Sequence, residues 1–438
     1  MAALPAISHD LYLVIDGSLK VWRHDNGAVD ILLEASHQQT DEVGSSVGAI
    51  THVRFDAAGH SLVAARQTAA DPPAYTLIWL DLSSGVQREI VSDLNYLIRL
   101  ELAPAGDQIA YILGDPTSLD DVGNGYLYPY RGTVYVKELP GSQSPQPVGT
   151  CTNVNLEGEL RSWPGCTGLL WSADNEQLLW SDARGVWAYQ ADSGADSLLQ
   201  PNAYHLGDGF EANVYVPLDW SPSGRYLRLS VGHYEGGSET ILDLETRTLI
   251  DIPFSRDVNG YPEFSKITWM QDDRLFIVRT EGFSDEPVSF AEIWRLAPEE
   301  KELQLEQSLD LSLSPDAFIN QAAQLNDGTF VFAAFSSALD DDSRGLYLLP
   351  DLHSAPHKTN ALPPDVRLEA MVIWAADGSE ALVAWYTSPH SPQFNGLTYD
   401  FVYVRPDENH FYEVRQFLGH AVDREGSLLQ LWWDNATD

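Results

Sequence analysis

The sequence predicts an all-β fold made of repeated four-stranded antiparallel sheets. Three observations predict it: a repeat about 50 residues long, short apolar strands separated by tight polar turns, and a composition rich in large aromatic residues. The 438-residue chain has 13 Trp and 19 Tyr, but three Met and two Cys. Since aromatic side chains favour strands, and one small sheet per repeat is typical of a propeller blade, we expect a single β-propeller.

Each repeat begins with a strand, a tight turn and a second strand. The clearest copies occupy residues 169–180, 218–229, 267–278 and 372–385, and weaker copies occupy 53–65, 100–112 and 322–335. A large residue stands four positions before the Gly-like turn position in most copies, and the aligned residues are Phe55, Leu102, Trp171, Trp220, Trp269, Gln324 and Trp374. Each copy is followed by an apolar strand, a short turn and a more polar strand, and the outer strand of a blade is expected to be polar because one of its edges faces solvent.

The two ends of the chain supply one further blade. Seven complete units lie between about residues 49 and 418. Residues 427–438 read as the innermost strand of a blade whose other strands lie within about residues 10–35, with Leu428–Trp433 joining Leu11–Ile15. We therefore expect eight four-stranded blades in one domain, 1–438, closed by its N- and C-terminal strands. Seven blades is the alternative, if the unit around 315–360 is irregular.

The turn sequence resembles that of a known family. The segment Trp220-Ser221-Pro222-Ser223-Gly224 is similar to the Trp-Ser-Pro-Asp-Gly turn of the TolB-type, WD-like bacterial propeller family. This resemblance implies the fold and a role in protein association, and it carries no catalytic residue across. Asn175 and Asp273 replace the usual Gly, and both residue types tolerate a left-handed backbone.

Charge and cysteine content limit the partners and the compartment. A formal charge of −39 disfavours nucleic acid and anionic membrane surfaces, whereas basic peptides, or solubility alone, remain as explanations. No apolar run is long enough to span a membrane. Cys151 and Cys166 lie in a polar connection and form either a disulfide or two free thiols. A disulfide favours an extracytoplasmic location with a trimmed signal, and a cytoplasmic location is the alternative.

The long loops carry the candidate binding residues. In a propeller, the connections from strand two to strand three and from blade to blade emerge on one face, and these are the long ones here. They combine acidic and aromatic residues that suit a basic or carbohydrate-like partner, unless they are simply solvated. The candidates are Asp120, Asp121, Tyr128, Tyr130, Arg131, His233, Tyr234, Glu235, Asp285, Asp341, Asp342 and His390.

Motifs for catalysis and metal binding are weak. Residues 44–48 match GxSxG but lack the strand–turn–helix setting of a nucleophile. Residues 120–125 and 340–345 suggest calcium only weakly, and no zinc or nucleotide spacing is present. We predict no catalytic residue, no metal ligand and no cofactor. The expected function is a binding or scaffolding propeller for a protein, peptide or glycan, acting through the long-loop face or the central channel. The alternative is a propeller lyase or hydrolase at the channel mouth, cation-dependent or not.

Overall fold

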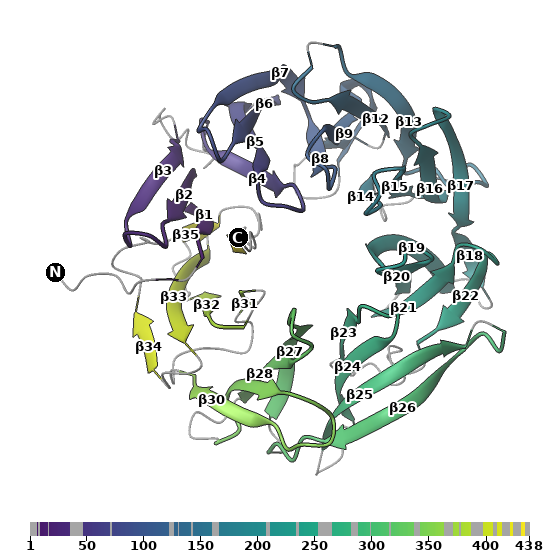
Figure 1. Ribbon diagram of the computed structural model, residues 1–438. Helices are drawn as coiled ribbons and strands as arrows, with labels where there is room; N and C mark the ends of the chain where they lie inside the picture. The colour runs from purple at the N-terminus through teal and green to yellow at the C-terminus, as the bar shows by residue number, and fades with distance from the viewer. Residues whose placement is uncertain are drawn as a thin grey trace. The chain divides into compact units, whose positions relative to one another are not determined.

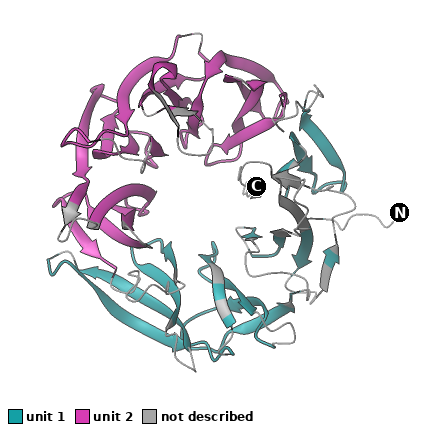
Figure 2. Cartoon of the chain, turned by 180° about the vertical axis from the view of Figure 1, so that it is seen from behind, with its two compact units in different colours: residues 1–35, 261–438 teal, residues 36–260 magenta. Residues whose placement is uncertain are grey.

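A computed structural model shows an all-β, eight-bladed β-propeller whose blades are mostly four-stranded and antiparallel (Figure 1). It describes residues 7, 9–15, 17–35, 47–70, 72–121, 127–129, 131–141, 143–159, 166–206, 211–233, 236–252, 265–281, 288–297, 299–314, 317–336, 342–362, 371–375, 378–386, 397–405, 410–413, 421–423 and 431–433. The chain divides into two compact units, residues 1–35 with 261–438 (unit 1) and residues 36–260 (unit 2), coloured separately in Figure 2.

Unit 2 contains four blades in chain order. The first comprises β4 (Ile50–Phe55), β5 (Ser61–Ala70), β6 (Pro73–Asp81) and β7 (Gln87–Asn95). The second comprises β8 (Leu97–Leu102), β9 (Gln108–Gly114), β12 (Arg131–Glu138) and β13 (Gln146–Thr152). The third comprises β14 (Thr167–Trp171), β15 (Gln177–Asp182), β16 (Gly185–Gln190) and β17 (Ala195–Pro201). The fourth comprises β19 (Glu211–Trp220), β20 (Tyr226–His233), β21 (Gly236–Asp243) and β22 (Thr248–Asp251), and β18 (Ala203–Leu206) adds to β19.

Unit 1 contains the other four blades. Three of them follow one another in the chain, and the first comprises β23 (Ser265–Trp269), β24 (Leu275–Glu281), β25 (Val288–Ala297) and β26 (Glu302–Asp310). The second comprises β27 (Ala317–Gln324), β28 (Phe330–Ser336), β29 (Gly345–Leu349) and β30 (His357–Ala361). The third comprises β31 (Met371–Trp374), β32 (Ala381–Tyr386), β33 (Leu397–Arg405) and β34 (His410–Glu413). A short strand, β35 (Ala421–Asp423), also pairs with β33. The weak unit around 315–360, on which the seven-blade alternative depended, is the regular four-stranded blade β27–β30, so the prediction of eight blades is confirmed.

The eighth blade joins the two ends of the chain. It comprises β36 (Leu431–Trp433), β1 (Leu11–Ile15), β2 (Ser18–Trp22) and β3 (Val29–Leu33). The register places Leu11 opposite Trp433 and Leu13 opposite Leu431. The predicted seam is therefore confirmed for residues 431–433. A shared blade protects two sheet edges that would otherwise be exposed.

The first turn of each complete blade has one backbone geometry. The residue predicted to be Gly-like has a positive φ in all seven described turns, and these residues are Gly59, Gly106, Asn175, Gly224, Asp273, Gly328 and Gly378. Its N–H donates to the carbonyl three residues earlier, as in Gly224 to Ser221 at 2.9 Å. This is a type I turn followed by a left-handed residue, a common hairpin loop. Asn175 and Asp273, with φ of 62° and 63°, replace Gly as the sequence predicts.

The core lies between successive blades. Between the second and third blades, Ile112 and Val134 pack with Leu178 and Trp180, all of which are fully buried. Between the blades β23–β26 and β27–β30, the rings of Phe276 and Phe330 stack with centroids 3.9 Å apart. The apolar alternation of each strand thus buries both faces of a blade. Among the described residues, no helix is both long and apolar enough to cross a membrane.

Candidate functional site

The predicted loop residues are distributed over several connections. Asp120, Asp121 and Tyr128 lie on a two-stranded hairpin, β10 (Leu119–Asp121) and β11 (Leu127–Pro129), inserted between β9 and β12. In its register, Asp120 is opposite Tyr128. Arg131 begins β12 and is exposed. The hairpin therefore contains three of the predicted residues, and a fourth, Arg131, follows it closely in the sequence.

The remaining predicted loop residues lie apart from this hairpin in the sequence. His233 ends β20 and is opposite Gly236. Asp342 is exposed, and its backbone carbonyl accepts a hydrogen bond of 2.5 Å from Nζ of Lys358. The other predicted residues lie outside the described part of the chain: Tyr130, Tyr234, Glu235, Asp285, Asp341 and His390.

The two cysteines form a disulfide with a Cα–Cα distance of 5.5 Å. It connects β13, the outermost strand of the second blade, to the residue before β14, the first strand of the third blade. Cys151 lies within a strand, not in the polar connection that the sequence suggested, and both cysteines are buried in the core between these blades. The disulfide therefore closes the segment between two adjacent blades.

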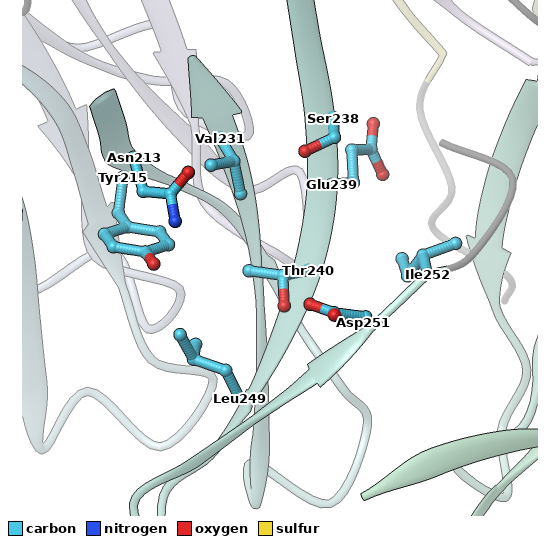
Figure 3. A pocket seen from close by; sticks show the side chains of 9 residues that line it. All are labelled: Asn213, Tyr215, Val231, Ser238, Glu239, Thr240, Leu249, Asp251 and Ile252. Atoms are coloured by element: carbon cyan, nitrogen blue, oxygen red, sulfur yellow. The ribbon is translucent and has the colours of Figure 1, made fainter. Parts of the chain in front are cut away.

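A small polar pocket lies in the fourth blade of unit 2 (Figure 3). Its polar lining comes from three strands, β19, β21 and β22, and includes Asn213, Tyr215, Ser238, Thr240 and Asp251. Val231 and Leu249 form apolar walls. The pocket has a volume of about 30 Å³. Because Val231 is opposite Ser238, two residues inside the pair His233–Gly236, the pocket adjoins a predicted binding loop.

Hydrogen bonds and burial fix the pocket walls. The backbone N–H of Tyr215 donates to Oδ1 of Asn202 at 2.9 Å, and the Thr240 hydroxyl donates to the Ile250 carbonyl at 3.0 Å. Burial raises the pKa of the Tyr215 phenol, and the nearby Asp251 carboxylate raises it further, against a hydrogen bond from Asn213. The phenol therefore stays protonated at neutral pH. Figure 3 shows the carboxylate of Asp251 beside Thr240, across from Tyr215.

Glu239 also borders the pocket, but it belongs to a second charged group. Its carboxylate points away from Tyr215 in Figure 3 and accepts a hydrogen bond of 3.1 Å from Arg228. Arg228 also donates to Asp219 on the neighbouring strand. Although burial alone would lower the pKa of Arg228, these two carboxylates raise it. Glu239 is thus partly neutralised, and Asp251 is the main negative charge facing the pocket.

A second polar group lies on the first strands of three successive blades of unit 2. We call it the inner-strand cluster, and it consists of His52, Arg54, Arg99, Glu101 and Thr167. Nε of Arg54 donates to Glu101 across the first two blades at 2.7 Å. Nη2 of Arg99 donates to the Thr167 hydroxyl across the next two at 3.2 Å. The cluster therefore links β4, β8 and β14.

Burial and the two arginines set the charge states of this cluster. Burial lowers the pKa of His52 to about 4, and the positive charges of Arg54 and Arg99 contribute. Burial raises the pKa of Glu101, although both arginines oppose that shift. His52 is therefore neutral at physiological pH, whereas for Glu101 burial outweighs the two arginines and raises the pKa.

The sequence carries a signal for this cluster that motif searching misses. Arg54 and Glu101 each precede the aligned residue of their repeat by one position, and His52 and Arg99 precede it by three. Equivalent positions of neighbouring blades lie side by side in a propeller. Opposite charges at one repeat position therefore predict an ion pair between blades, even though they are far apart in the sequence.

Within the described residues, no three His, Cys, Asp or Glu side chains gather in a way that could hold a metal ion. The acidic run that includes Asp341 lies largely outside the described residues.

No family model matches the chain, and no curated protein matches it. Among solved structures, it is similar to dihydro-heme d1 dehydrogenase NirN in complex with DHE, with 11% identity, a TM-score of 0.52 and coverage of 99% of this chain and 78% of that one. It also matches TolB from Acinetobacter baumannii, with 14% identity, a TM-score of 0.34 and coverage of 86% and 84%. Dipeptidyl peptidase 4 from Porphyromonas gingivalis matches with 9% identity, a TM-score of 0.43 and coverage of 84% and 60%. At such identities the likeness to NirN shows the propeller fold and nothing finer.

Proposed function

We propose that this chain is a binding propeller that recognises a protein or peptide partner through a lysine side chain. The observation that carries the proposal is the polar pocket of the fourth blade in unit 2, which combines one carboxylate with hydroxyl and amide groups. It lies at the loop end of its blade, next to His233. Long-loop ends of repeat proteins are where partners usually bind.

The size and chemistry of the pocket suit an ammonium group. An ammonium presents three N–H donors, and Asp251, Ser238 and the Tyr215 phenol oxygen offer acceptors. A volume of about 30 Å³ exceeds the roughly 10–15 Å³ that one water molecule requires, so the pocket has room for a small polar group. The apolar walls, Val231 and Leu249, suit the methylene stem of a lysine.

The charge of the whole chain supports the same class of partner. With a formal charge of −39, the surface attracts basic proteins over long distances and accelerates their encounter. Such attraction selects a basic partner but does not orient it. A defined pocket for one cationic head supplies the orientation.

The test is binding of lysine-containing peptides by calorimetry at low salt, with the same peptides acetylated on lysine as the first control. We expect acetylation, and separately Asp251→Asn, to weaken binding by about tenfold or more, because each removes a charge-assisted hydrogen bond. Glu89→Gln removes an exposed carboxylate on β7 and should leave binding unchanged. Equal loss in both variants would mean that net charge alone attracts the peptide.

A glycan array tests the other partner class in the same experiment. Glycan binding that disappears in Asp251→Asn, without any lysine-dependent binding, would replace the peptide proposal by a carbohydrate one. If the intact protein binds neither lysine-containing peptides nor glycans, the proposal is wrong.

Two further properties are proposed on single observations. The disulfide Cys151–Cys166 supports an extracytoplasmic location, because such bonds persist in oxidising compartments. The turn Trp220-Ser221-Pro222-Ser223-Gly224 supports kinship with TolB-type propellers. Fractionation of the native host tests the first, since a protein found only in the cytoplasm would contradict it.

A further inference from the structure

A group of three charged side chains extends from the polar pocket of Figure 3 across three adjacent strands of its blade. We call it the arginine triad, and it consists of Asp219 on β19, Arg228 on β20 and Glu239 on β21. Nε of Arg228 donates to Oδ1 of Asp219 at 3.0 Å, and Nη2 donates to Oδ2. Nη1 donates to Oε2 of Glu239 at 3.1 Å. One guanidinium therefore joins two carboxylates.

An irregularity in β19 brings Asp219 opposite this guanidinium. Pro217 is opposite Leu229, and after a shift in register Asp219, in place of Leu218, is opposite Arg228. Leu218 is left 38% exposed. A bulge of this kind changes the direction of the side chains on one strand. Because Asp219 accepts two hydrogen bonds from the planar guanidinium, it fixes the orientation in which Arg228 meets its second carboxylate.

Glu239 is the member of the triad that lines the pocket. It stands on β21 between two other lining residues, Ser238 and Thr240, and its carboxylate lies away from Tyr215 in Figure 3. The Arg228 side chain is 13% exposed. Although burial lowers the pKa of Arg228, the hydrogen bonds and charges of its two carboxylate partners outweigh this effect. A permanent positive charge therefore balances a carboxylate at the edge of the pocket.

This balance determines which cations the pocket suits. The charges of Asp251 and Glu239 together, beside hydroxyl and amide oxygens, would suit a divalent cation such as Ca²⁺, which prefers several hard oxygen ligands. When Arg228 balances Glu239, one net negative charge remains, that of Asp251. A single carboxylate among neutral acceptors suits a monovalent ammonium with three N–H donors.

We propose that Arg228 determines the charge specificity of the pocket, because it balances Glu239 and so favours a lysine ammonium over a divalent cation. Arg228 acts through Glu239 and is a positioning residue, and Asp219 orients it. The inference rests on the function proposed for the pocket, and its test distinguishes the failure of one from the failure of the other.

Calorimetry at low salt with two probes, a lysine-containing peptide and calcium chloride alone, tests the assignment. Arg228→Gln should tighten peptide binding by about threefold or more, because it leaves the Glu239 charge unbalanced. The same variant should bind Ca²⁺ at millimolar concentrations at which the unmodified protein does not. A purely structural role for Arg228 predicts the opposite sign for the peptide, since breaking a largely buried ion pair disturbs the pocket wall.

Four variants serve as controls. Arg228→Gln/Glu239→Gln removes both charges together and should restore both measurements to those of the unmodified protein. Arg228→Gln/Asp251→Asn should not bind Ca²⁺. Arg88→Gln, on the exposed strand β7, changes the net charge equally and should alter neither measurement. Thermal denaturation checks folding. If Arg228→Gln is unstable, Glu239→Gln alone decides, because it should weaken peptide binding by about threefold, and unchanged affinity would overturn the inference.

The two proposals fail in different ways. Unchanged or weaker peptide binding in Arg228→Gln, while binding still depends on Asp251, overturns the inference and leaves the proposed function intact. If the unmodified protein binds no lysine-containing peptide, the proposed function is wrong, and Ca²⁺ binding by Arg228→Gln then decides whether Arg228 balances the pocket. Absence of Ca²⁺ binding in that variant overturns the inference in either case. An equal gain in Arg88→Gln would assign the effect to net charge and also overturn it.

Discussion

The hydroxyl of Tyr403 donates a hydrogen bond of 2.5 Å to Oε1 of Glu380, a carboxylate with only 1% of its side chain exposed. Nε of Arg405 donates to the same hydroxyl at 3.0 Å. Tyr403 also packs against Trp22, with ring centroids 5.4 Å apart. One phenol therefore connects the first turn of the blade β31–β34 to the blade that joins the chain ends. Burial raises the pKa of Tyr403 far above its usual range, and the Glu380 charge adds to the shift.

Replacing this phenol should destabilise the protein. Tyr403→Phe keeps the ring and removes the donor to a buried carboxylate, so we expect a loss of about 1–3 kcal/mol in the free energy of unfolding. Urea denaturation followed by tryptophan fluorescence measures it. The double variant Tyr403→Phe/Glu380→Gln should lose less than the sum of the two single variants, since the buried charge is gone. Strict additivity would show that the hydrogen bond does not couple the two residues.

The left-handed turn positions should differ in their tolerance of alanine. Gly224→Ala meets no atom within 4 Å, so we expect only the backbone cost, about 1 kcal/mol. The Cβ of Gly378→Ala would lie 2.2 Å from Cδ1 of Leu325, so it should cost more. Asp273→Gly, which relieves a left-handed Asp, should not destabilise. Thermal denaturation ranks the three variants, and an equal loss for both alanines would mean that Leu325 moves aside freely.

The disulfide should contribute measurably to stability. It closes a segment with a sequence separation of 15 residues, for which restriction of the unfolded chain predicts about 3 kcal/mol. We expect dithiothreitol to lower the melting temperature of the protein. The variant Cys151→Ser/Cys166→Ser should melt at the lower temperature with or without the reductant. If the reductant also affects this variant, the change does not come from the disulfide.

His52 should make stability depend on pH below neutrality. Its pKa is lowered from 6.5 to about 4 in the folded protein, so the unfolded chain binds a proton first as the pH falls. The stability that the neutral ring contributes is present above pH 6.5 and is lost progressively toward pH 4. Comparing the protein with His52→Gln between about pH 5 and 7.5 keeps the measurement above the pI near 4.4. We expect a shallower decline in the variant, and parallel curves would contradict the assigned burial.

The fold could be predicted because its determinants recur. Seven copies of one turn define the repeat length. The residue four positions after each aligned residue has a left-handed backbone, and its type, Gly, Asn or Asp, indicates that conformation from the sequence alone. The seam followed from the strand order, since Leu11 and Trp433 complete the pattern that every other blade shows. Because the repeats give many independent indications of the same geometry, a weak copy such as 322–335 does not change the predicted fold.

The candidate sites could not be predicted in the same way, because each is assembled from strands that are distant in the sequence. Asp251 and Tyr215 meet only through the β-sheet pairing of β19 to β22, and neither belongs to a motif. Arg54 and Glu101 pair only because neighbouring blades align equivalent positions. The composition of the loops indicated His233, which lies two positions along β20 from the pocket residue Val231. It did not indicate the pocket residues on the neighbouring strands.

The pairing of β1 with β36 has a consequence for the order of folding. Its partners, such as Leu13 and Leu431, are about 420 positions apart, whereas the four main strands of every other blade come from one continuous stretch of the chain. The entropy of closing so long a loop opposes this contact until the intervening blades are compact. During folding, strands β1–β3 therefore remain an incomplete sheet with an open edge until the rest of the chain has folded. Slow refolding and aggregation should arise at this one blade, and a circular permutant that covalently joins Trp433 to Leu11 should relieve both.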